Sequence, residues 1–129
     1  MGPIPTRIDG VALGVSDVEA SADFYRDVMA FTELSRTSEI ARFALENVRL
    51  TLVRTDVLLD ETHLTSFPEP PGPVTLAIYV PRDDVDTYMQ ALADAGVRII
   101  APAEDKPLGP RIGFAADPDG HIWEIIEDY

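Results

Sequence analysis

His121 and Glu124 are the residues near the C-terminus whose side chains could ligate a metal or transfer a proton. They stand in an alternating run, residues 121–127, that predicts a β-strand. Successive side chains of a strand point to opposite faces, so a spacing of three places these two on opposite sides of a sheet. They cannot chelate one metal ion together, and we expect His121 to be a turn residue after Gly120. The other histidine, His63, falls in a long connection, where we expect a solvent-facing side chain.

Glu124 shares its predicted strand face with Ile122 and Ile126. A carboxylate among apolar side chains needs a partner, because burying it unpaired is costly. Arg49 is the partner that we expect, and such an ion pair would be purely structural. Two functional interpretations stay open beside it: Glu124 binds an amine of a ligand, or it acts as a general acid or base.

The elements that position these residues follow a recognisable order in the first half of the chain. The pattern predicts a strand at 11–15, a helix at 18–29 and strands at 40–45 and 48–54. Ser16-Asp17 supply a helix N-cap signal, and Glu46-Asn47 supply a hairpin turn. A long connection over 55–73 follows, and its proline-rich end excludes a helix or a central strand.

The second half repeats that order. It predicts a strand at 74–80, a helix from 83 or 84 to about 95, a strand at 97–101 and a hairpin of 111–115 with 121–127. The turn of this hairpin has the sequence Asp117-Pro118-Asp119-Gly120, which is typical of a tight turn. Residues 107–113 contain glycine without the Lys-Ser or Lys-Thr of a phosphate loop, so we interpret them as a rim of the site. The chain is therefore an internal duplication of a βαβββ unit.

Strand parity indicates where a ligand could lie. The first strand has one bulky face, which suits packing against a helix. Its other face presents only small residues, which are Gly10, Ala12 and Gly14. The corresponding face of the repeated strand presents Thr75, Ala77 and Tyr79. A face of this kind either admits another backbone closely or leaves room for a ligand, and both interpretations stay open.

Four aromatic residues of the predicted strands divide between core and cavity. Trp123 has the opposite parity to Glu124, so we expect it to pack toward the helices. Phe43, Tyr79 and Phe114 are the candidates for a cavity, and of these only Tyr79 has its face fixed by the repeat.

The chain has 129 residues, a mass of 14.1 kDa and no cysteine, which fits one ordinary domain without disulfides or thiol chemistry. Its 10 basic and 23 acidic residues give a net charge of −13. That charge repels nucleic acid and anionic membranes and attracts a cationic small molecule. The sequence has no signal-peptide pattern and no apolar run of membrane-spanning length, so we expect a cytoplasmic protein without a nucleic-acid or membrane partner.

Two motifs lie at opposite ends of the chain: Phe24-Tyr25-Arg26-Asp27 and the run from Asp117 to Glu124. With the duplicated plan, they resemble the vicinal-oxygen-chelate superfamily, which holds glyoxalase I, extradiol dioxygenases, fosfomycin-resistance enzymes and bleomycin-resistance proteins. The resemblance implies an α+β fold, in which two tandem βαβββ modules form a curved, partly open mixed β-barrel with the helices on the outside. It implies a homodimer and a single domain over 1–129, with module one at about 8–56, a linker at about 57–73 and module two at about 74–127.

The superfamily's enzymes hold a divalent metal with His, Gln or Glu at the start of each module's first strand and Glu or His on each last strand. The matching positions here are Gly10 and Thr75 on the first strands, and Arg49 or Thr51 and Glu124 on the last strands. Only Glu124 is of a metal-ligating type, and one carboxylate cannot hold a catalytic metal against water. We therefore expect no metal and no cofactor.

The predicted function is that of a metal-independent small-molecule-binding protein that sequesters a bulky drug or natural product, closest in character to the bleomycin-resistance proteins. We expect a cationic or aromatic ligand in a concave pocket at a dimer interface. The predicted ligand-binding residues are Gly10, Ala12, Gly14, Arg49, Thr51, Thr75, Tyr79, Arg111, Phe114 and Glu124. The alternative is an enzyme of the superfamily, either metal-independent with Glu124 as acid or base and Arg49 or Arg111 stabilising negative charge, or a metal-dependent lyase or dioxygenase.

Overall fold

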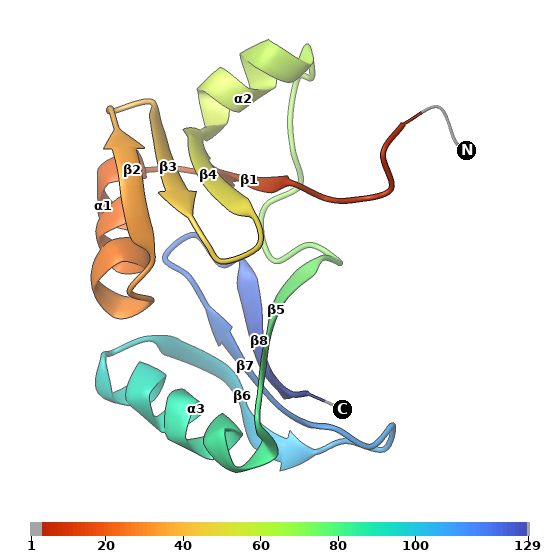
Figure 1. Cartoon of the computed structure of the whole chain (residues 1–129). Coiled ribbons are helices and arrows are strands. Elements are labelled where there is room, and N and C mark those ends of the chain that lie inside the picture. Colours follow the sequence, from red (N-terminus) through yellow and green to blue (C-terminus); the bar gives the residue numbers. More distant parts are fainter. Residues whose placement is uncertain (1–3, 129) are drawn as a thin grey trace. The chain divides into compact units, whose positions relative to one another are not determined.

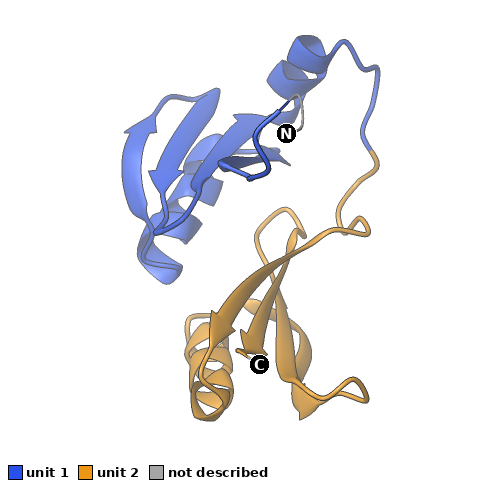
Figure 2. Cartoon of the chain, turned by 45° about the vertical axis from the view of Figure 1, so that its right-hand side comes forward, with its two compact units in different colours: residues 1–67 blue, residues 68–129 orange. Residues whose placement is uncertain are grey.

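The computed structural model describes residues 4–128 (Figure 1). The chain forms two compact units, within residues 1–67 and 68–129, and each holds one four-stranded mixed sheet with a helix packed on one face (Figure 2). Each unit contains the order strand, helix, strand, strand, strand, and neither sheet closes into a barrel. The α+β class and the duplicated βαβββ plan predicted from the sequence are confirmed.

The first unit contains four strands and two α-helices. Its elements are β1 (Gly10–Val15), α1 (Val18–Asp23), a π-helical turn (Phe24–Val28), β2 (Thr32–Arg36), β3 (Ile40–Ala44), β4 (Arg49–Arg54) and α2 (Thr55–Thr62). The strands lie in the order β1-β4-β3-β2, with β1 parallel to β4 and the other pairs antiparallel. This register places Gly10 beside Arg49 and Val15 beside Arg54.

The core of the first unit lies between its sheet and the helix that begins at Val18. Every second residue of β1 and β4 points to this side, and the buried ones are Leu13, Val15, Leu50 and Leu52. Tyr25, in the π-helical turn, is fully buried, and its ring centroid lies 6.2 Å from that of Phe43. Phe43 is itself fully buried and therefore belongs to the core, not to a cavity.

Asp17 caps the first helix, as its place before the helical run predicts. Its carboxylate accepts a hydrogen bond from the backbone N–H of Ala20 at 3.1 Å. Asp17→Ala should lower the free energy of unfolding by about 1 kcal/mol, because that N–H loses its acceptor. Asp17→Ser retains an acceptor and should stay close to wild type. Equilibrium urea unfolding measures both variants, and equal losses would contradict the cap.

Two elements of the first unit, β2 and α2, are not predicted from the sequence. In β2 the alternation of apolar and polar residues is hidden for two reasons. Glu33 and Arg36 both face the helix side, where they form an ion pair at 2.6 Å. A bulge also shifts the register between Glu33 and Ser35. The predicted long connection instead begins with α2, which has no buried residue and no side-chain cap at its start. This helix ends at His63, which is exposed, as expected, and adopts a left-handed conformation.

The second unit repeats the topology of the first. Its elements are β5 (Thr75–Val80), a short 3-10 turn (Arg82–Asp84), α3 (Val85–Asp94), β6 (Arg98–Asp105), β7 (Arg111–Ala116) and β8 (Ile122–Glu127). The strands lie in the order β5-β8-β7-β6, with β5 parallel to β8. Strand β6 continues to Asp105, beyond the predicted end at Ala101, because an edge strand tolerates Pro102.

The hairpin of β7 and β8 contains the tight turn that the sequence predicts. The Asp117 carboxylate accepts hydrogen bonds from the backbone N–H groups of Asp119 at 3.0 Å and His121 at 2.8 Å. Gly120 has φ of 97°, a conformation that favours glycine. His121 is thus a turn residue, and Trp123 is 5 % exposed on the face of β8 that packs against α3, both as predicted.

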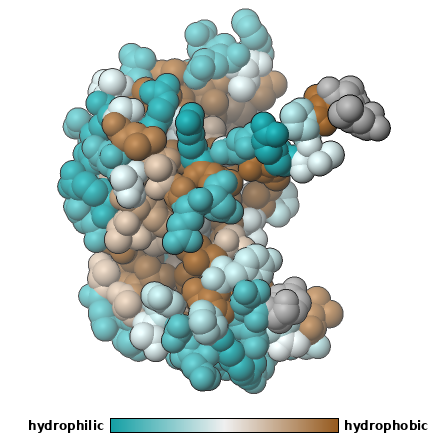
Figure 3. All heavy atoms as spheres, in the orientation of Figure 1, coloured by the Kyte–Doolittle hydropathy of each residue, from teal (hydrophilic) through white to brown (hydrophobic). Residues whose placement is uncertain are grey.

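The face of the molecule drawn in Figure 3 is mainly polar. In the view of Figure 3, hydrophilic residues cover most of the visible surface and hydrophobic residues reach it in patches. Tyr79 is among the large apolar side chains that remain exposed. Within residues 4–128, none of the helices is long and apolar enough to span a membrane.

Candidate functional site

Each sheet has a face that packs against α1 or α3 and an opposite face, which we call the open face. Paired residues on neighbouring strands share a face, so the register assigns its members. The open face of the first sheet consists of Gly10, Ala12, Gly14, Thr32, Ser35, Ile40, Arg42, Ala44, Arg49, Thr51 and Val53. It includes every first-unit residue that the sequence analysis assigned to ligand binding.

At Gly14 the open face of the first sheet is covered by α2. A Cβ on Gly14 would lie 3.5 Å from Leu58 Cδ2 and 3.6 Å from Thr55 Oγ1. The neighbouring Val53 is only 3 % exposed. Of the two interpretations of the small-residue strand face, close packing therefore applies at Gly14.

The other end of the same strand is uncovered. Gly10 and Ala12 are exposed, and Thr51, which pairs with Ala12, is half-buried. Among the described residues, the one atom within 4 Å of a Cβ on Gly10 would be the Arg49 carbonyl oxygen, at 3.4 Å. This end of the open face has room for the atoms of a ligand.

Arg49 and Arg42 project from this open face, and both are exposed. Arg49 was predicted there, whereas the sequence analysis did not single out Arg42. The signal for Arg42 is its place between Ala41 and Phe43, which are both fully buried on the helix side. In a strand, the residue between two core-facing residues must face the other way.

The second sheet has a more apolar open face. Its members are Thr75, Ala77, Tyr79, Arg98, Ala101, Glu104, Ile112, Phe114, Ala116, Ile122, Glu124 and Ile126. Four predicted ligand-binding residues share it: Thr75, Tyr79, Phe114 and Glu124. The residues predicted on the first strand of this unit and Glu124 on its last strand therefore lie on the same face of the sheet.

Glu124 has a hydrogen-bond partner within its own sheet. The Thr75 hydroxyl donates a short hydrogen bond to Glu124 Oε2. Thr75 pairs with Ile122 and Glu124 with Ala77, so the two are diagonal neighbours on adjacent strands. The expectation that this half-buried carboxylate needs a partner is met by a neutral hydroxyl. The ion pair with Arg49, which belongs to the first unit, stays a prediction.

Aromatic rings frame this carboxylate. Phe114 stands directly opposite Glu124 and is half-buried, whereas Tyr79 is 60 % exposed. Lys106 Nζ lies 5.7 Å from the centroid of the Phe114 ring and also pairs with Glu104. The open face of the second sheet thus combines exposed ring surface with one hydrogen-bonded carboxylate.

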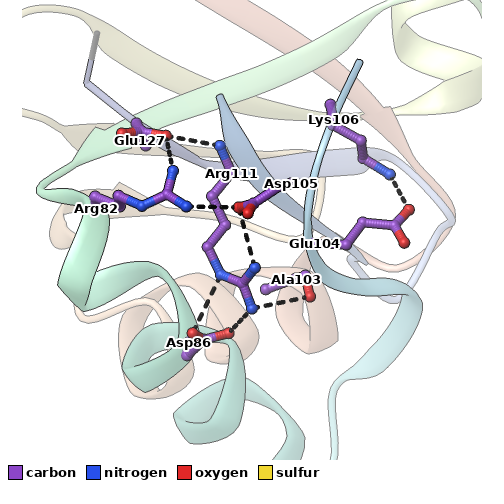
Figure 4. Close-up of polar contacts among 8 residues, drawn as sticks. All are labelled: Arg82, Asp86, Ala103, Glu104, Asp105, Lys106, Arg111 and Glu127. Atoms are coloured by element: carbon purple, nitrogen blue, oxygen red, sulfur yellow. Dashed lines mark hydrogen bonds and ion pairs between the residues drawn. The ribbon is translucent and has the colours of Figure 1, made fainter. Parts of the chain in front are cut away.

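Arg111 does not share the open face. It is three residues from Phe114 along β7, so its side chain points to the opposite side of the sheet. There its guanidinium contacts Asp86 of α3 at 2.8 Å and Asp105 of β6 at 3.2 Å (Figure 4). Arg111 was predicted to bind the ligand, but here it pairs with acidic neighbours, and we leave it out of the proposed site.

Arg111 and Arg82 form a network around Asp105 (Figure 4). The hydrogen bond from Arg111, assisted by the charge of Arg82 at 2.8 Å, holds the pKa of the Asp105 carboxyl below its usual value. A carboxyl group whose pKa is lower in the folded chain than in the unfolded chain stabilises the fold at pH values above its pKa in the unfolded chain. This stabilisation is lost as the pH falls through the pKa of the same group in the folded chain.

Acidification below about pH 4 should therefore weaken the network. As the pH falls below about 4, we expect the free energy of unfolding to decrease less steeply in Asp105→Asn than in wild type, because the variant lacks the carboxyl whose pKa is lowered. Arg111→Gln should flatten the profile in the same direction. Urea unfolding at successive pH values measures the slopes, and unchanged slopes in both variants would refute the linkage.

Residues 7–125 match the Glyoxalase/Bleomycin resistance protein/Dioxygenase superfamily. The chain belongs to this superfamily, which confirms the resemblance seen in its motifs. A glyoxalase-related enzyme from Fulvimarina pelagi is 31% identical, with a TM-score of 0.85 over 96% of this chain and 89% of that chain. A glyoxalase/bleomycin resistance protein/dioxygenase from Nocardioides is 27% identical, with a TM-score of 0.84 over 98% of this chain and 85% of that chain. Lactoylglutathione lyase from Agrobacterium tumefaciens, at 20% identity, shares the fold, with a TM-score of 0.78 over 96% and 95%.

The residues at the superfamily's metal positions do not fit a divalent ion. Gly10, Thr75 and either Arg49 or Thr51 offer no carboxylate or imidazole, and the remaining position, Glu124, accepts the Thr75 hydroxyl. Among residues 4–128, no three His, Cys, Asp or Glu side chains form a group that could hold a metal ion.

Proposed function

We propose that this protein binds an apolar or aromatic small molecule on the open face of its second sheet, without a metal. The observation that carries the proposal is the hydrogen bond between Thr75 and Glu124. In the superfamily's enzymes these two positions hold metal ligands, whereas here the hydroxyl and the carboxylate satisfy each other. The carboxylate is stabilised inside its own sheet, and its neighbours Ile122 and Ile126 are already buried. The exposed side chains of Ala77 and Tyr79 are therefore the part of this face that is left to a ligand.

Exposed ring surface supports an aromatic or apolar ligand. Tyr79 is 60 % exposed beside Ala77, which is small and exposed on the same strand face. A large ring loses favourable burial when it stays in water, and it recovers that burial when a flat ligand stacks on it. The chemistry of this face suits a ligand with an extended apolar skeleton.

Sequestration of the ligand, without chemical change, is our proposal for the role of this binding. The same contact favours a second candidate, a metal-independent enzyme in which Glu124 acts as a general base toward a hydroxyl. The two differ in the fate of the ligand. A compound captured by the protein from a library of aromatic natural products should be recovered with unchanged mass, and a changed mass would favour the enzyme.

Titration with N-phenyl-1-naphthylamine, a neutral fluorophore that brightens in apolar surroundings, tests the binding. Tyr79→Ser should weaken its affinity by about 5-fold, the order expected for loss of one aromatic contact. Tyr88→Ser is the matched control, because Tyr88 lies on α3 and is 49 % exposed, and its affinity should equal wild type. Absence of binding in wild type, or equal effects of the two variants, would overturn the proposal.

We also propose that two copies of the chain form a dimer, as members of this superfamily commonly do. Light scattering on eluted protein should then give twice the mass of one 14.1 kDa chain. A monomeric mass at the concentration used for ligand titration would show that one chain suffices for binding.

A further inference from the structure

We infer that the open face of the first sheet, by itself, binds the anionic group of a small molecule through Arg42 and Arg49. The inference goes beyond the proposed function, because it concerns a second surface, which lies within the first unit. It runs against the net charge of −13, which by itself attracts cations. The position of the basic side chains, and not the total charge, carries the argument.

This open face is basic in an acidic protein. Acidic residues outnumber basic ones by 23 to 10 in the whole chain. Among the residues that β1 to β4 place on the open face, however, there are two arginines and no aspartate or glutamate. The strand residues of this face therefore carry a net positive charge, and beside Arg42 and Arg49 their local field favours an anion.

Arg42 and Arg49 also differ from the other arginines of the first unit. Those others each contact a carboxylate at 3.0 Å or less, and they are Arg7, Arg26, Arg36 and Arg54. Within the described part of the first unit, neither Arg42 nor Arg49 forms an ion pair. Both side chains are exposed, so their guanidinium groups are available to a ligand.

The register places the two arginines at a distance that one anionic group can bridge. Arg42 pairs with Thr51 and Arg49 pairs with Ala44, so the arginines are diagonal neighbours on β3 and β4. Diagonal Cβ atoms lie roughly 7–8 Å apart, within reach of two long side chains that converge on one group. Two like charges so placed repel each other, and an anion between them removes this cost and accepts hydrogen bonds from both.

Small neighbours keep these groups accessible. Gly10 lies beside Arg49, and Ala12 lies beside Thr51, with both small residues exposed. A planar guanidinium binds carboxylate, sulfonate or phosphate oxygens in a two-pronged geometry. The ligand class is therefore a small molecule that carries one such group.

A pair of related fluorophores isolates the contribution of the anion. The probes are 8-anilinonaphthalene-1-sulfonate and the neutral N-phenyl-1-naphthylamine, which share a skeleton and differ in the sulfonate. Arg42→Gln and Arg49→Gln should each weaken sulfonate binding by about 5-fold and leave the neutral probe within about 2-fold of wild type. Arg26→Gln is the matched control, because it removes the same charge from the π-helical turn and should affect neither probe.

Other results would overturn the inference and leave the proposed function intact. If the neutral probe binds but the sulfonate is insensitive to Arg42→Gln and Arg49→Gln, the arginines do not bind the anion. If neither probe binds to wild type, the proposed function itself fails. Melting curves of each variant should match wild type, because both arginines are exposed.

Discussion

Tyr25→Ala is expected to lower the free energy of unfolding by about 3–5 kcal/mol, the range for removing a buried aromatic ring. Tyr25 is fully buried in the core of the first unit. Its ring lies 5.0 Å from Phe24, 5.9 Å from Phe31 and 6.2 Å from Phe43, measured between centroids. Truncation leaves a cavity among three rings that come from the π-helical turn, the segment before β2 and strand β3, and these cannot all move inward together.

Tyr88→Ala supplies the control for this substitution. Tyr88 lies on α3 and is 49 % exposed, so its truncation should stay within about 0.5 kcal/mol of wild type. Equilibrium unfolding in urea, followed by far-UV circular dichroism, measures both. A loss below about 1 kcal/mol for Tyr25→Ala would mean that the core around the first helix is not packed as described.

Gly113→Ala is expected to destabilise the second unit by about 1–3 kcal/mol through overpacking. A Cβ on Gly113 of β7 would lie 2.6 Å from both Cγ and Sδ of Met89, which projects from α3. Gly72→Ala should be close to neutral, because nothing lies within 4 Å of a Cβ at that position. Comparing the two variants distinguishes the steric clash with Met89 from the general effect of replacing a glycine by alanine.

A double-mutant cycle identifies the cause of this loss. Met89→Ala alone should be destabilising, because Met89 is only 5 % exposed. In the Met89→Ala background, however, Gly113→Ala should be neutral or stabilising, because the clash is gone and the unfolded chain has less freedom. If the two losses simply add, the contact between α3 and β7 is not the reason that glycine occupies position 113.

Much of the fold follows from local signals in the sequence. The parity of residues 10–15 and 75–80, the cap at Asp17 and the turn at Asp117–Gly120 each have a physical cause that acts within a few residues. Strand β2 and helix α2 lack such signals. In β2 an ion pair between Glu33 and Arg36 occupies the helix side, where sequence reasoning expects apolar residues.

The candidate site could be predicted only in part. The face of Glu124 and its need for a partner follow from the sequence, but the partner does not, because Thr75 reaches it only through the parallel register of β5 and β8. The sequence alone could have predicted that Arg111 and Phe114 face opposite sides of the sheet. It is three residues from Phe114 in one strand, and the parity rule that separates His121 from Glu124 separates these two as well.

The charge of the ligand is a second feature that the sequence alone does not predict. A net charge of −13 led to the expectation of a cationic ligand. A summed charge, however, says nothing about where the charges lie. Only the pairing of β3 with β4 brings Arg42 and Arg49 together on one face without a carboxylate. Local charge at a site is set by strand register, which sequence composition does not contain.

The most direct test of metal-independent binding combines metal content with ligand affinity. Elemental analysis of gently purified protein should find no stoichiometric metal. The melting temperature and the affinity for N-phenyl-1-naphthylamine should be the same after dialysis against a chelator and after addition of Ni²⁺, Zn²⁺, Mn²⁺ or Fe²⁺. A specific metal stabilises the fold that binds it, so one metal ion per chain that raises the melting temperature would contradict the proposed function.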